Sequence, residues 1–313
     1  MSTSLGCQLS VVLPVFNEEG NLRELYQRLS KVLRDNLNLT VYEIIFVDDF
    51  SRDGSWKIIE ELNQKDPLVR GIKFSRNFGH HIALSAGINS SRGDAVVMMD
   101  SDLQDLPEEI PKLYGMFSRG YDVVYGIRKV KKYNVFKKET SRIFNWLMNS
   151  IIDADVKINS NIFRIMSRRV IEVFNQYKER DRNITGLISY AGFKEIGVEV
   201  EHGARFSGKT KYSLTKMLRL AMNSLTAFSI RPLQLASWVG FILSFFGFIS
   251  IIYLIIAKIF FGMGILGWTS LLVVIIFIGG IQMLFLGLLG EYIGRIFLEV
   301  KGRPLYVVEK YLE

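Results

Sequence analysis

Short runs that favour β-strands recur along the N-terminal third of the chain, and each one is followed by polar or charged side chains. These runs are residues 9–14, 43–47, 69–74 and 95–99; the second begins with Glu43, and the third includes Arg70 and Lys73. The run 95–99 is continuously apolar and bounded by polar residues, which is typical of a buried strand. The pattern therefore predicts four strands.

The segments between these strands carry apolar residues at helical spacing. The first such segment has Leu22, Leu25, Leu29, Val32 and Leu33. Similar spacing predicts a helix around Trp56, Ile59 and Leu62, another over residues 80–90, and a fourth that begins at Pro107. Strands that alternate with helices at these intervals predict an α/β fold with a doubly wound, mostly parallel sheet.

Polar side chains follow all four predicted strands. They are Asn17 and Glu18, Asp48 and Asp49, Arg76 and Asn77, and Asp100 and Asp102. In an open α/β sheet, ligands bind outside the carboxyl ends of the strands. Charge at four separate strand ends is hard to explain as ordinary turn composition, so we expect the chemistry of the protein at this edge.

The acidic stretch 97–109 is the centre of this prediction. Asp100 and Asp102, one residue apart, can place hard oxygen ligands on a divalent cation that keeps its other positions for phosphate oxygens and water. The alternative is that both are solvated turn acids and that Asp105 caps the helix near Pro107. No loop is glycine-rich enough for a P-loop or a dinucleotide fingerprint. The stretch is thus equipped to handle a nucleoside diphosphate through a metal ion.

The C-terminal third is different in character. Residues 232–257 and 259–290 contain no charged side chain, and each stretch exceeds the roughly 20 residues needed to cross a hydrocarbon layer. A buried core helix is the alternative. Basic residues flank the pair on both sides, at Lys209, Lys211, Lys216, Arg219, Arg231, Arg295, Lys301 and Arg303. The positive-inside rule places both flanks in the cytoplasm, which predicts a helical hairpin.

An apolar stripe precedes the first span. Its residues are Leu214, Met217, Leu218, Ala221, Leu225 and Phe228. In a soluble helix the stripe would face the core, but beside a membrane span and among basic residues it favours an interfacial helix on the bilayer. The expected domains are a cytoplasmic catalytic domain (1–210), an interfacial helix (211–231), two transmembrane helices (232–297) and a cytoplasmic tail (298–313).

Composition is consistent with a membrane protein. The chain has 313 residues, a formal net charge of +8, a hydrophobic fraction of 49% and a positive mean hydropathy. A basic protein this apolar indicates a lipid bilayer as partner and no nucleic acid. Cys7 is the only cysteine, which excludes an intramolecular disulfide and is compatible with the cytoplasm. Residues 1–8 lack a basic start and an apolar region, so no cleaved signal peptide is expected.

Several motifs resemble those of a known family. They are PVFNEE at 14–19, IIFVDDFSRDGS at 44–55, SRNFGHH at 75–81, DSDLQDLPE at 100–108, YGIRK at 125–129, ERDRNITGLISYAGF at 179–193 and RFSGKTKYSLTKM at 205–217. With the two apolar segments after Pro232, the chain resembles the inverting family-two glycosyltransferases of the glycosyltransferase-A fold. Within these it is most similar to polyprenyl-phosphate glycosyltransferases such as dolichol-phosphate mannose synthase and the bactoprenol glucosyltransferases.

The resemblance implies roles for individual residues. Those that would bind the nucleotide sugar are Pro14, Asn17, Glu18, Asp49, Arg76 and Asp100. Those that would hold Mg²⁺ or Mn²⁺ against the diphosphate are Asp100, Asp102 and Gln104, and Asp102 would be directly catalytic. Those that would bind the lipid phosphate are Arg128, Arg142 and Arg205, since guanidinium forks match phosphate oxygens. For any one of these arginines, an ordinary surface charge is the alternative.

The segment 157–164 departs from the family pattern. The family carries an acidic, glycine-containing sequence before its Phe-Arg pair, whereas this chain has no carboxylate between Lys157 and Phe163. Asp155 and Asp181 remain as further candidate catalytic carboxylates, with Asp181 favoured by its ERD motif. A protein base matters little here, because a phosphate monoester has a second pKa of about 6 and is already nucleophilic at neutral pH.

The expected function is the inverting, metal-dependent transfer of a hexose from a nucleotide sugar to a polyprenyl phosphate. The resemblance points to UDP-glucose as donor and undecaprenyl phosphate as acceptor, at the cytoplasmic face of the inner (plasma) membrane. The protein would be multi-pass, with both termini cytoplasmic and room for a homo-oligomer through the membrane region. One alternative is a processive polysaccharide synthase, which would carry a Q-x-x-R-W motif that is absent here. The other, a non-enzymatic membrane scaffold, leaves the polar strand ends unexplained.

Overall fold

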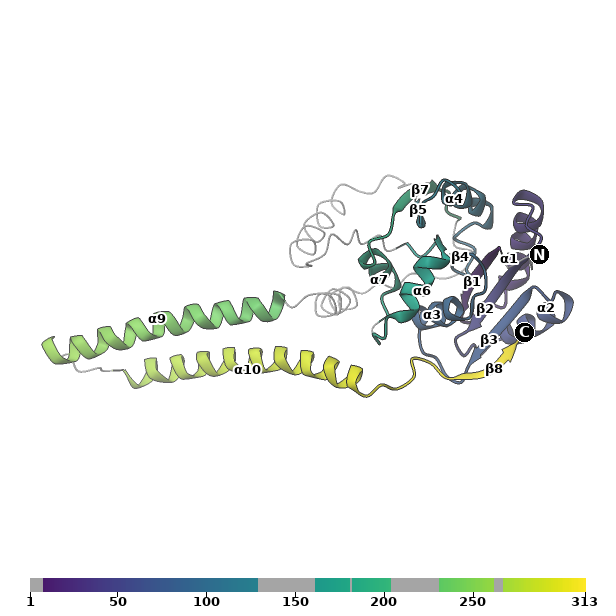
Figure 1. Ribbon diagram of the computed structural model, residues 1–313. Helices are drawn as coiled ribbons and strands as arrows, with labels where there is room; N and C mark the ends of the chain where they lie inside the picture. The colour runs from purple at the N-terminus through teal and green to yellow at the C-terminus, as the bar shows by residue number, and fades with distance from the viewer. Residues whose placement is uncertain (1–7, 129–160, 181, 204–230, 262–266) are drawn as a thin grey trace. The chain divides into compact units, whose positions relative to one another are not determined.

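The computed structural model describes residues 8–128, 161–180, 182–203, 231–261 and 267–313. The chain divides into two compact units (Figure 1). The first unit comprises Met1–Tyr133, Asp155–Thr210 and Arg303–Glu313, and the second comprises Asn134–Ala154 and Lys211–Gly302. The chain thus passes from the first unit to the second and back twice, and its last residues belong to the first unit.

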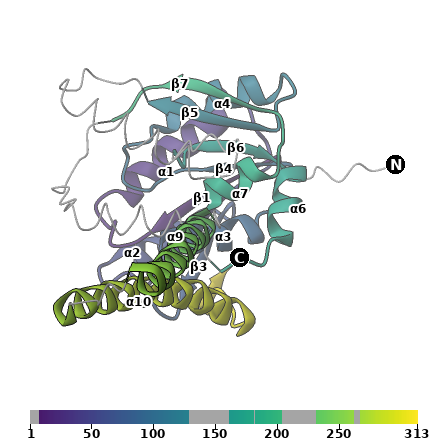
Figure 2. The same ribbon diagram turned by 90° about the vertical axis from the view of Figure 1, so that its left-hand side faces the viewer.

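The first unit is built on a single sheet of the described strands. The strands are β1 (Leu9–Val15), β2 (Tyr42–Asp48), β3 (Val69–Phe74), β4 (Ala95–Met98), β5 (Val123–Arg128), β6 (Arg164–Ser167), β7 (Glu195–Val200) and β8 (Val308–Leu312). Their order is β7-β5-β6-β4-β1-β2-β3-β8, and Figure 2 shows it from β7 at the top to β3 near the bottom. The pairs β1·β2, β1·β4, β2·β3 and β5·β7 are parallel, and β3·β8, β4·β6 and β5·β6 are antiparallel.

Helices cover both faces of this sheet. One face packs against α1 (Leu22–Lys31), α2 (Ser55–Lys65) and α4 (Ile110–Phe117), and the other against α3 (His80–Ser90), α6 (Arg168–Gln176) and α7 (Ile184–Tyr190). On β1, Val11 and Leu13 belong to the first apolar cluster, whereas Val12 belongs to the second, as the alternation of side chains along a strand requires. Every residue of β1 and β2 is buried. This two-sided burial is the reason these strands read as mostly apolar runs in the sequence.

The predicted elements of the N-terminal third are confirmed. The structure has β3 at Val69–Phe74 and α3 at His80–Ser90, the predicted bounds, and the other three strands agree within one or two residues. The helix expected from Pro107 begins there as a 3₁₀ turn, Pro107–Glu109, before α4. The first helix ends in a π-helical stretch, Val32–Asn36, which the spacing did not indicate.

The C-terminal residues, which the sequence analysis places in a tail, contribute β8 to the sheet. This strand pairs antiparallel with β3, and Ile72 lies opposite Tyr311. An ion pair between Lys310 and Glu60 (Nζ to Oε1, 2.6 Å) adds to the backbone pairing. The strand therefore covers an edge of β3 that would otherwise expose its backbone hydrogen-bonding groups.

The second unit contains two long helices, α9 (Arg231–Phe261) and α10 (Trp268–Val300), which lie side by side (Figure 1). In the described part of the chain, Phe277–Val300 is long and apolar enough to cross a membrane, and Ala236–Ser250 is a shorter apolar helix. Large apolar side chains on both helices are more than half exposed, including Phe241, Phe246, Phe277 and Phe297. That both helices cross a bilayer stays a prediction. The expected interfacial helix lies at residues outside the described ranges, apart from Arg231.

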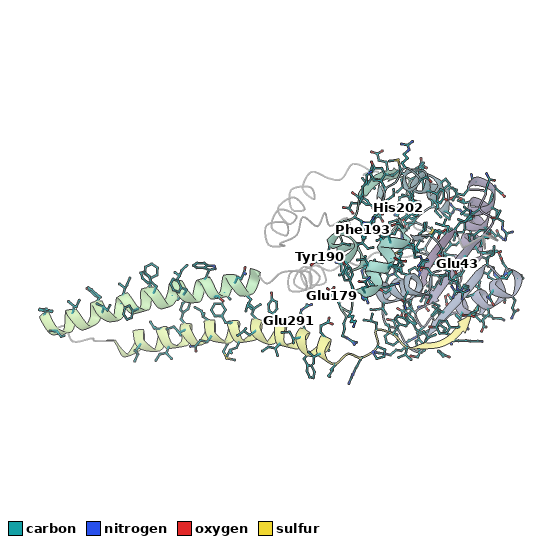
Figure 3. All side chains as sticks on the ribbon, in the orientation of Figure 1. Glu43, Glu179, Tyr190, Phe193, His202 and Glu291 are labelled. Atoms are coloured by element: carbon teal, nitrogen blue, oxygen red, sulfur yellow. The ribbon has the colours of Figure 1, made fainter. Side chains whose placement is uncertain are left out.

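A buried carboxylate locks the amino ends of the strands together. Glu43, marked within the first unit in Figure 3, is only 5% exposed. Its Oε1 accepts hydrogen bonds from Ser10 Oγ and from the Arg92 backbone N–H, both at 2.6 Å, and its Oε2 pairs with Arg70 Nη1 at 2.7 Å. Ser10 Oγ in turn accepts from the Gly93 N–H at 2.8 Å. One side chain of β2 thus ties together β1, β3 and the loop before β4.

Replacement of Glu43 by alanine should destabilise the first unit. The change leaves Arg70, which is only 11% exposed, without its carboxylate partner and the Arg92 N–H without its acceptor, for which a loss of about 3 kcal/mol is typical. The midpoint of thermal unfolding of the detergent-solubilised protein should fall by several degrees. Glu61→Ala, which removes only the exposed ion pair with Arg23, is the control and should leave the midpoint unchanged. Equal midpoints for the two variants would contradict the assigned role of Glu43.

Candidate active site

The carboxyl ends of β1, β2 and β4 meet at one edge of the sheet, because the parallel register places Val12 opposite both Ile45 and Met98. A pocket of about 330 Å³ lies at this edge. It is lined by Pro14, Val15, Phe16, Glu18, Asp49, Asn77, Gly79, His80, Ala83, Asp100, Ser101 and Asp102. The structure therefore brings together residues from all four of the strand ends singled out in the sequence.

Asp49 joins the end of β2 to the loop that follows β3. Its carboxylate accepts hydrogen bonds from the backbone N–H groups of Phe78 (2.6 Å) and Gly79 (2.9 Å), and Asn77 Nδ2 donates to the Asp49 carbonyl at 3.1 Å. Burial raises the pKa of the Asp49 carboxyl, and the two backbone donors oppose that shift. Gly79 has φ = 102°, a conformation that glycine adopts without steric penalty. The loop is thus shaped so that two N–H groups converge on one carboxylate.

The loop after β1 is held by hydrogen bonds to the loop after β2. Asn17 has φ = 58°, a left-handed conformation that asparagine tolerates better than most residues. Its N–H donates to Ser51 Oγ at 3.0 Å, and its Oδ1 accepts from the Arg52 N–H at 2.8 Å. Glu18 lines the pocket, whereas Asn17 does not. The described contacts of Asn17 are therefore those of a residue that fixes the loop.

The acidic loop after β4 presents two carboxylates to the pocket. Ser101, between them, turns inward and donates from its Oγ to the Pro14 carbonyl at 2.7 Å. Asp102 accepts from the Gln104 backbone N–H (3.1 Å) and from Gln104 Nε2 (2.6 Å). Leu103, between these two, has φ = 60°. The loop is therefore tightly turned, and Asp100, Ser101 and Asp102 all line the pocket.

Gln104 connects this loop to the segment that follows β7. Its Oε1 lies 3.1 Å from His202 Nε2, and its backbone carbonyl accepts from the Gly203 N–H at 2.9 Å. His202 Nδ1 is also 3.6 Å from Asp105 Oδ1. Asp105 is buried and does not cap the following helix, whose cap residue is Leu106. In this arrangement Gln104 holds Asp102 and does not line the pocket, and its role as a metal ligand stays a prediction.

His80 adds an imidazole at the mouth of the pocket. Its Nε2 lies 3.3 Å from Asp100 Oδ1, and its side chain is 42% exposed. Desolvation by the surrounding protein lowers the pKa of His80, although Asp49 and Asp102 oppose the shift. Desolvation thus favours the neutral form of the ring, whereas the carboxylates beside it favour the charged form.

The donor atoms of the pocket fit a hard divalent cation. Among the residues that the structure describes, no three His, Cys, Asp or Glu side chains form a ready-made metal site. Mg²⁺ is commonly held by one or two carboxylates and completed by phosphate oxygens and water. Asp100 and Asp102 supply such a pair on one face of an acidic pocket. The two carboxylates are thus suited to a cation whose other coordination positions are filled by a phosphate-bearing ligand and water.

The remaining predicted residues either do not line this pocket or lie outside the described ranges. Arg76 is exposed, and its guanidinium stacks on the Phe78 ring at 4.4 Å from the centroid. Arg128 is the last residue of β5. The others are Arg142, Asp155, Asp181 and Arg205, which lie outside the described residues.

Comparison with known proteins identifies the family. Residues 10–174, more than half of the chain, match the model of glycosyl transferase family 2. The chain belongs to glycosyltransferase family 2. It is 44% identical to the uncharacterized glycosyltransferase YkcC of Bacillus subtilis, over 97% of this chain and 94% of that protein. It is 38% identical to a prophage bactoprenol glucosyl transferase homolog of Escherichia coli, over 97% of this chain and 99% of that protein.

Solved structures support the fold of this family 2 glycosyltransferase. The mannosyltransferase PcManGT from Pyrobaculum calidifontis superposes with a TM-score of 0.51 and 16% identity, over 73% of this chain and 65% of that one. At this identity the likeness concerns the fold alone. With the family match, it confirms the predicted glycosyltransferase-A type of α/β architecture and the prediction of an enzyme.

Two histidines of this glycosyltransferase were not predicted as site residues. His80 belongs to the SRNFGHH motif, and its position in the loop region after β3, directly after the glycine that precedes α3, could have marked it as a pocket residue. His202 follows β7, and nothing in the local sequence indicates that the chain there returns to the acidic loop. The bridge between Asp105 and His202 is a long-range contact that only the folded sheet creates.

Replacement of Asp49 by asparagine should loosen the loop after β3. One carboxylate oxygen becomes an NH₂ group that cannot accept from the Phe78 or Gly79 N–H. Such charged hydrogen bonds contribute about 1.5–3 kcal/mol, so amide exchange at these two positions should become at least about tenfold faster. Hydrogen exchange with mass spectrometry on the solubilised protein measures this. Asp53→Asn, at the exposed Glu19 N–H, is the control, and unchanged exchange in Asp49→Asn would contradict the assignment.

Proposed function

We propose that this enzyme transfers glucose from UDP-glucose to undecaprenyl phosphate, with inversion, at the cytoplasmic face of the plasma membrane. The observation that carries the proposal is the acidic pocket in which Asp49, Asp100 and Asp102 converge at the strand ends. The relative from E. coli is named a bactoprenol glucosyl transferase homolog, and a bactoprenol glucosyl transferase of Shigella phage SfII is 38% identical over 97% of this chain and 98% of its own length. These names support the choice of acceptor and sugar.

The donor side of the proposal assigns the pocket to the nucleotide sugar. Pro14, Glu18 and Asp49 line the pocket and would contact the nucleoside, where carboxylates can accept hydrogen bonds from ribose hydroxyls and base N–H groups. Asn17 would act by fixing the loop that carries Glu18. Arg76, stacked on Phe78 beside the pocket, would approach the diphosphate.

Asp100 and Asp102 would hold Mg²⁺ or Mn²⁺, with Gln104 keeping Asp102 in position. When bound, the cation supplies a positive charge that stabilises the departing diphosphate. The chain's own contribution is the fixed turn of the acidic loop, which Ser101 anchors to Pro14 and His202 anchors through Gln104. A loop fixed in advance does not need to reorganise as charge develops in the reaction.

The acceptor side rests on arginines. Arg128, Arg142 and Arg205 would bind the lipid phosphate through charge-assisted, forked hydrogen bonds. A phosphate oxygen would attack the anomeric carbon of the sugar, the bond from that carbon to the nucleoside diphosphate would break, and the configuration would invert. Because the phosphate is ionised at neutral pH, no protein base is required. Asp155 and Asp181 remain candidates for an accessory role.

The membrane part of the proposal uses the second unit. The apolar surfaces of α9 and α10 suit a lipid environment, and Phe277–Val300 has the length and composition of a span. We assign both helices to a transmembrane hairpin, preceded by an interfacial helix over residues 211–231. The catalytic domain would then meet a lipid-borne acceptor at the bilayer surface.

The direct test is product analysis with purified protein. Wild-type enzyme with Mn²⁺ and undecaprenyl phosphate is incubated with a panel of radiolabelled nucleotide sugars, and lipid products are separated by thin-layer chromatography. The proposal predicts label in the lipid fraction from UDP-glucose. Label from another nucleotide sugar alone would change the donor, and no labelled lipid from any donor would overturn the function.

The same assay tests the acidic loop. Asp102→Asn should lower turnover by on the order of a hundredfold, because a carboxamide binds a hard divalent cation poorly and charge stabilisation in the reaction is lost. The matched control is Asp94→Asn, which changes an exposed aspartate directly before the amino end of β4. Activity of Asp102→Asn within about threefold of the control would refute the metal assignment.

Cysteine accessibility tests the hairpin. In a Cys7→Ser background, single cysteines replace Gly267, just before α10, and Lys301, just after it. A membrane-impermeant maleimide added to intact cells should label position 267, whereas position 301 should react only after permeabilisation. Labelling of both positions, or of neither, in intact cells would contradict a hairpin with both flanks in the cytoplasm.

A further inference from the structure

The last residues of the chain contact the loop that carries part of the pocket. We call residues 303–312 the C-terminal strap and residues 75–79 the donor loop. Within the strap, β8 pairs with β3 up to Val308, which lies opposite Phe74. One further backbone bond, from the Ser75 N–H to the Val307 carbonyl at 3.0 Å, extends the pairing into the first residue of the donor loop. The strap is thus bonded to the donor loop at its origin.

Three aromatic rings continue this contact toward the pocket. The ring of Tyr306 stacks on that of Phe74, with centroids 5.1 Å apart and planes at 22°. Phe74 is fully buried, and its ring meets Phe78 edge-on at 5.5 Å and 83°. Both stacked and edge-to-face arrangements are favourable aromatic geometries. Tyr306 and Phe78 are therefore linked through a single buried ring.

Phe78 is the residue through which this contact reaches the site. Its backbone N–H binds the Asp49 carboxylate, as does the N–H of Gly79, and its ring carries the guanidinium of Arg76. Asn77 and Gly79, on either side of it, line the pocket. A shift of the Phe78 ring would move the N–H groups that hold Asp49. Tyr306 does not itself line the pocket, so it can influence the site only through these neighbours.

The strap is also held at its first residue. The Arg180 guanidinium donates to the Arg303 carbonyl, so that the segment is fixed on both sides of Tyr306. Residues 301–305 alone separate Tyr306 from Val300, the last residue of α10. The strap is therefore the direct continuation of the helix that qualifies as a membrane span. The ring of Tyr306 is the first aromatic side chain after that helix.

We propose that Tyr306 is a positioning residue for donor binding. Its ring supports Phe74 and Phe78 and so keeps the donor loop in the shape that holds Asp49 and presents Asn77 and Gly79. The inference rests on the proposed function, because it takes the pocket as the site of the nucleotide sugar. It adds that the affinity for the nucleotide depends on a residue from the far end of the chain.

The test compares ring removal with ring retention in the full-length protein. Calorimetry in detergent with Mn²⁺ present measures the Kd for UDP. Tyr306→Ala should raise this Kd by about tenfold, which is the change expected when one modest contact is lost. Tyr306→Phe should stay within about twofold, since it loses only the contact in which Asn89 Nδ2 donates to the hydroxyl at 3.5 Å. Tyr311→Ala, which removes an exposed ring from the same strap, is the matched control and should bind as wild type does.

A kinetic measurement separates positioning from general destabilisation. In Tyr306→Ala the KM for the nucleotide sugar should rise while the KM for polyprenyl phosphate stays constant, and amide exchange across residues 75–79 should accelerate. If Tyr306→Ala does not fold, Tyr306→Leu retains an apolar side chain and should show the same split. Donor affinity equal to wild type in the folded variant, or an equal rise in both KM values, would overturn the inference. Wild-type protein that binds no nucleotide would instead overturn the proposed function.

Discussion

The pocket depends on two backbone N–H groups that converge on the carboxylate of Asp49. A carboxylate that is only 3% exposed is unfavourable unless hydrogen bonds replace its lost hydration. Phe78 and Gly79 provide these bonds, and the positive φ of Gly79 makes the convergence sterically accessible. The interaction joins the end of β2 to the loop after β3, and so fixes one wall of the pocket.

The other acidic residues of the pocket are arranged differently. Asp49 meets its hydrogen bonds within the protein, whereas Asp100 and Asp102 remain partly exposed, and their loop is held by Ser101 and Gln104. His80 lies beside Asp100, with its Nε2 3.3 Å from Asp100 Oδ1. The fold thus separates two tasks that carboxylates perform at strand ends. Asp49 shapes the loop that lines the pocket, and Asp100 and Asp102 leave oxygen atoms available for a cation and its ligand.

The sequence predicted those parts of the fold that depend on local pattern. The predicted bounds of β3 and α3 agree with the structure, because a short strand-forming run that stops at Ser75 and a helix that follows Gly79 are local signals. The sequence also indicated that the strand ends would meet, since parallel strands share one edge. Two features depend on long-range pairing instead. The strand Val308–Leu312 is short, carries two charged residues and follows a long apolar helix, and His202 contacts the acidic loop across the sheet. No local pattern encodes either contact.

The return of the chain to the sheet places α9 and α10 between the two edge strands in the sequence. β7 and β8 are the two edge strands of the described sheet, and the chain passes from one to the other by way of α9 and α10. Along the chain, β7 precedes α9 and β8 follows α10. Residues next to each of these two strands contact a loop that lines the pocket. On the β7 side His202 and Gly203 hold the acidic loop, and on the β8 side Tyr306 and Val307 hold the loop of Phe78. Because both halves of the pocket are fastened to the chain segments that lead to the second unit, movement of either segment would act on the site through a named contact.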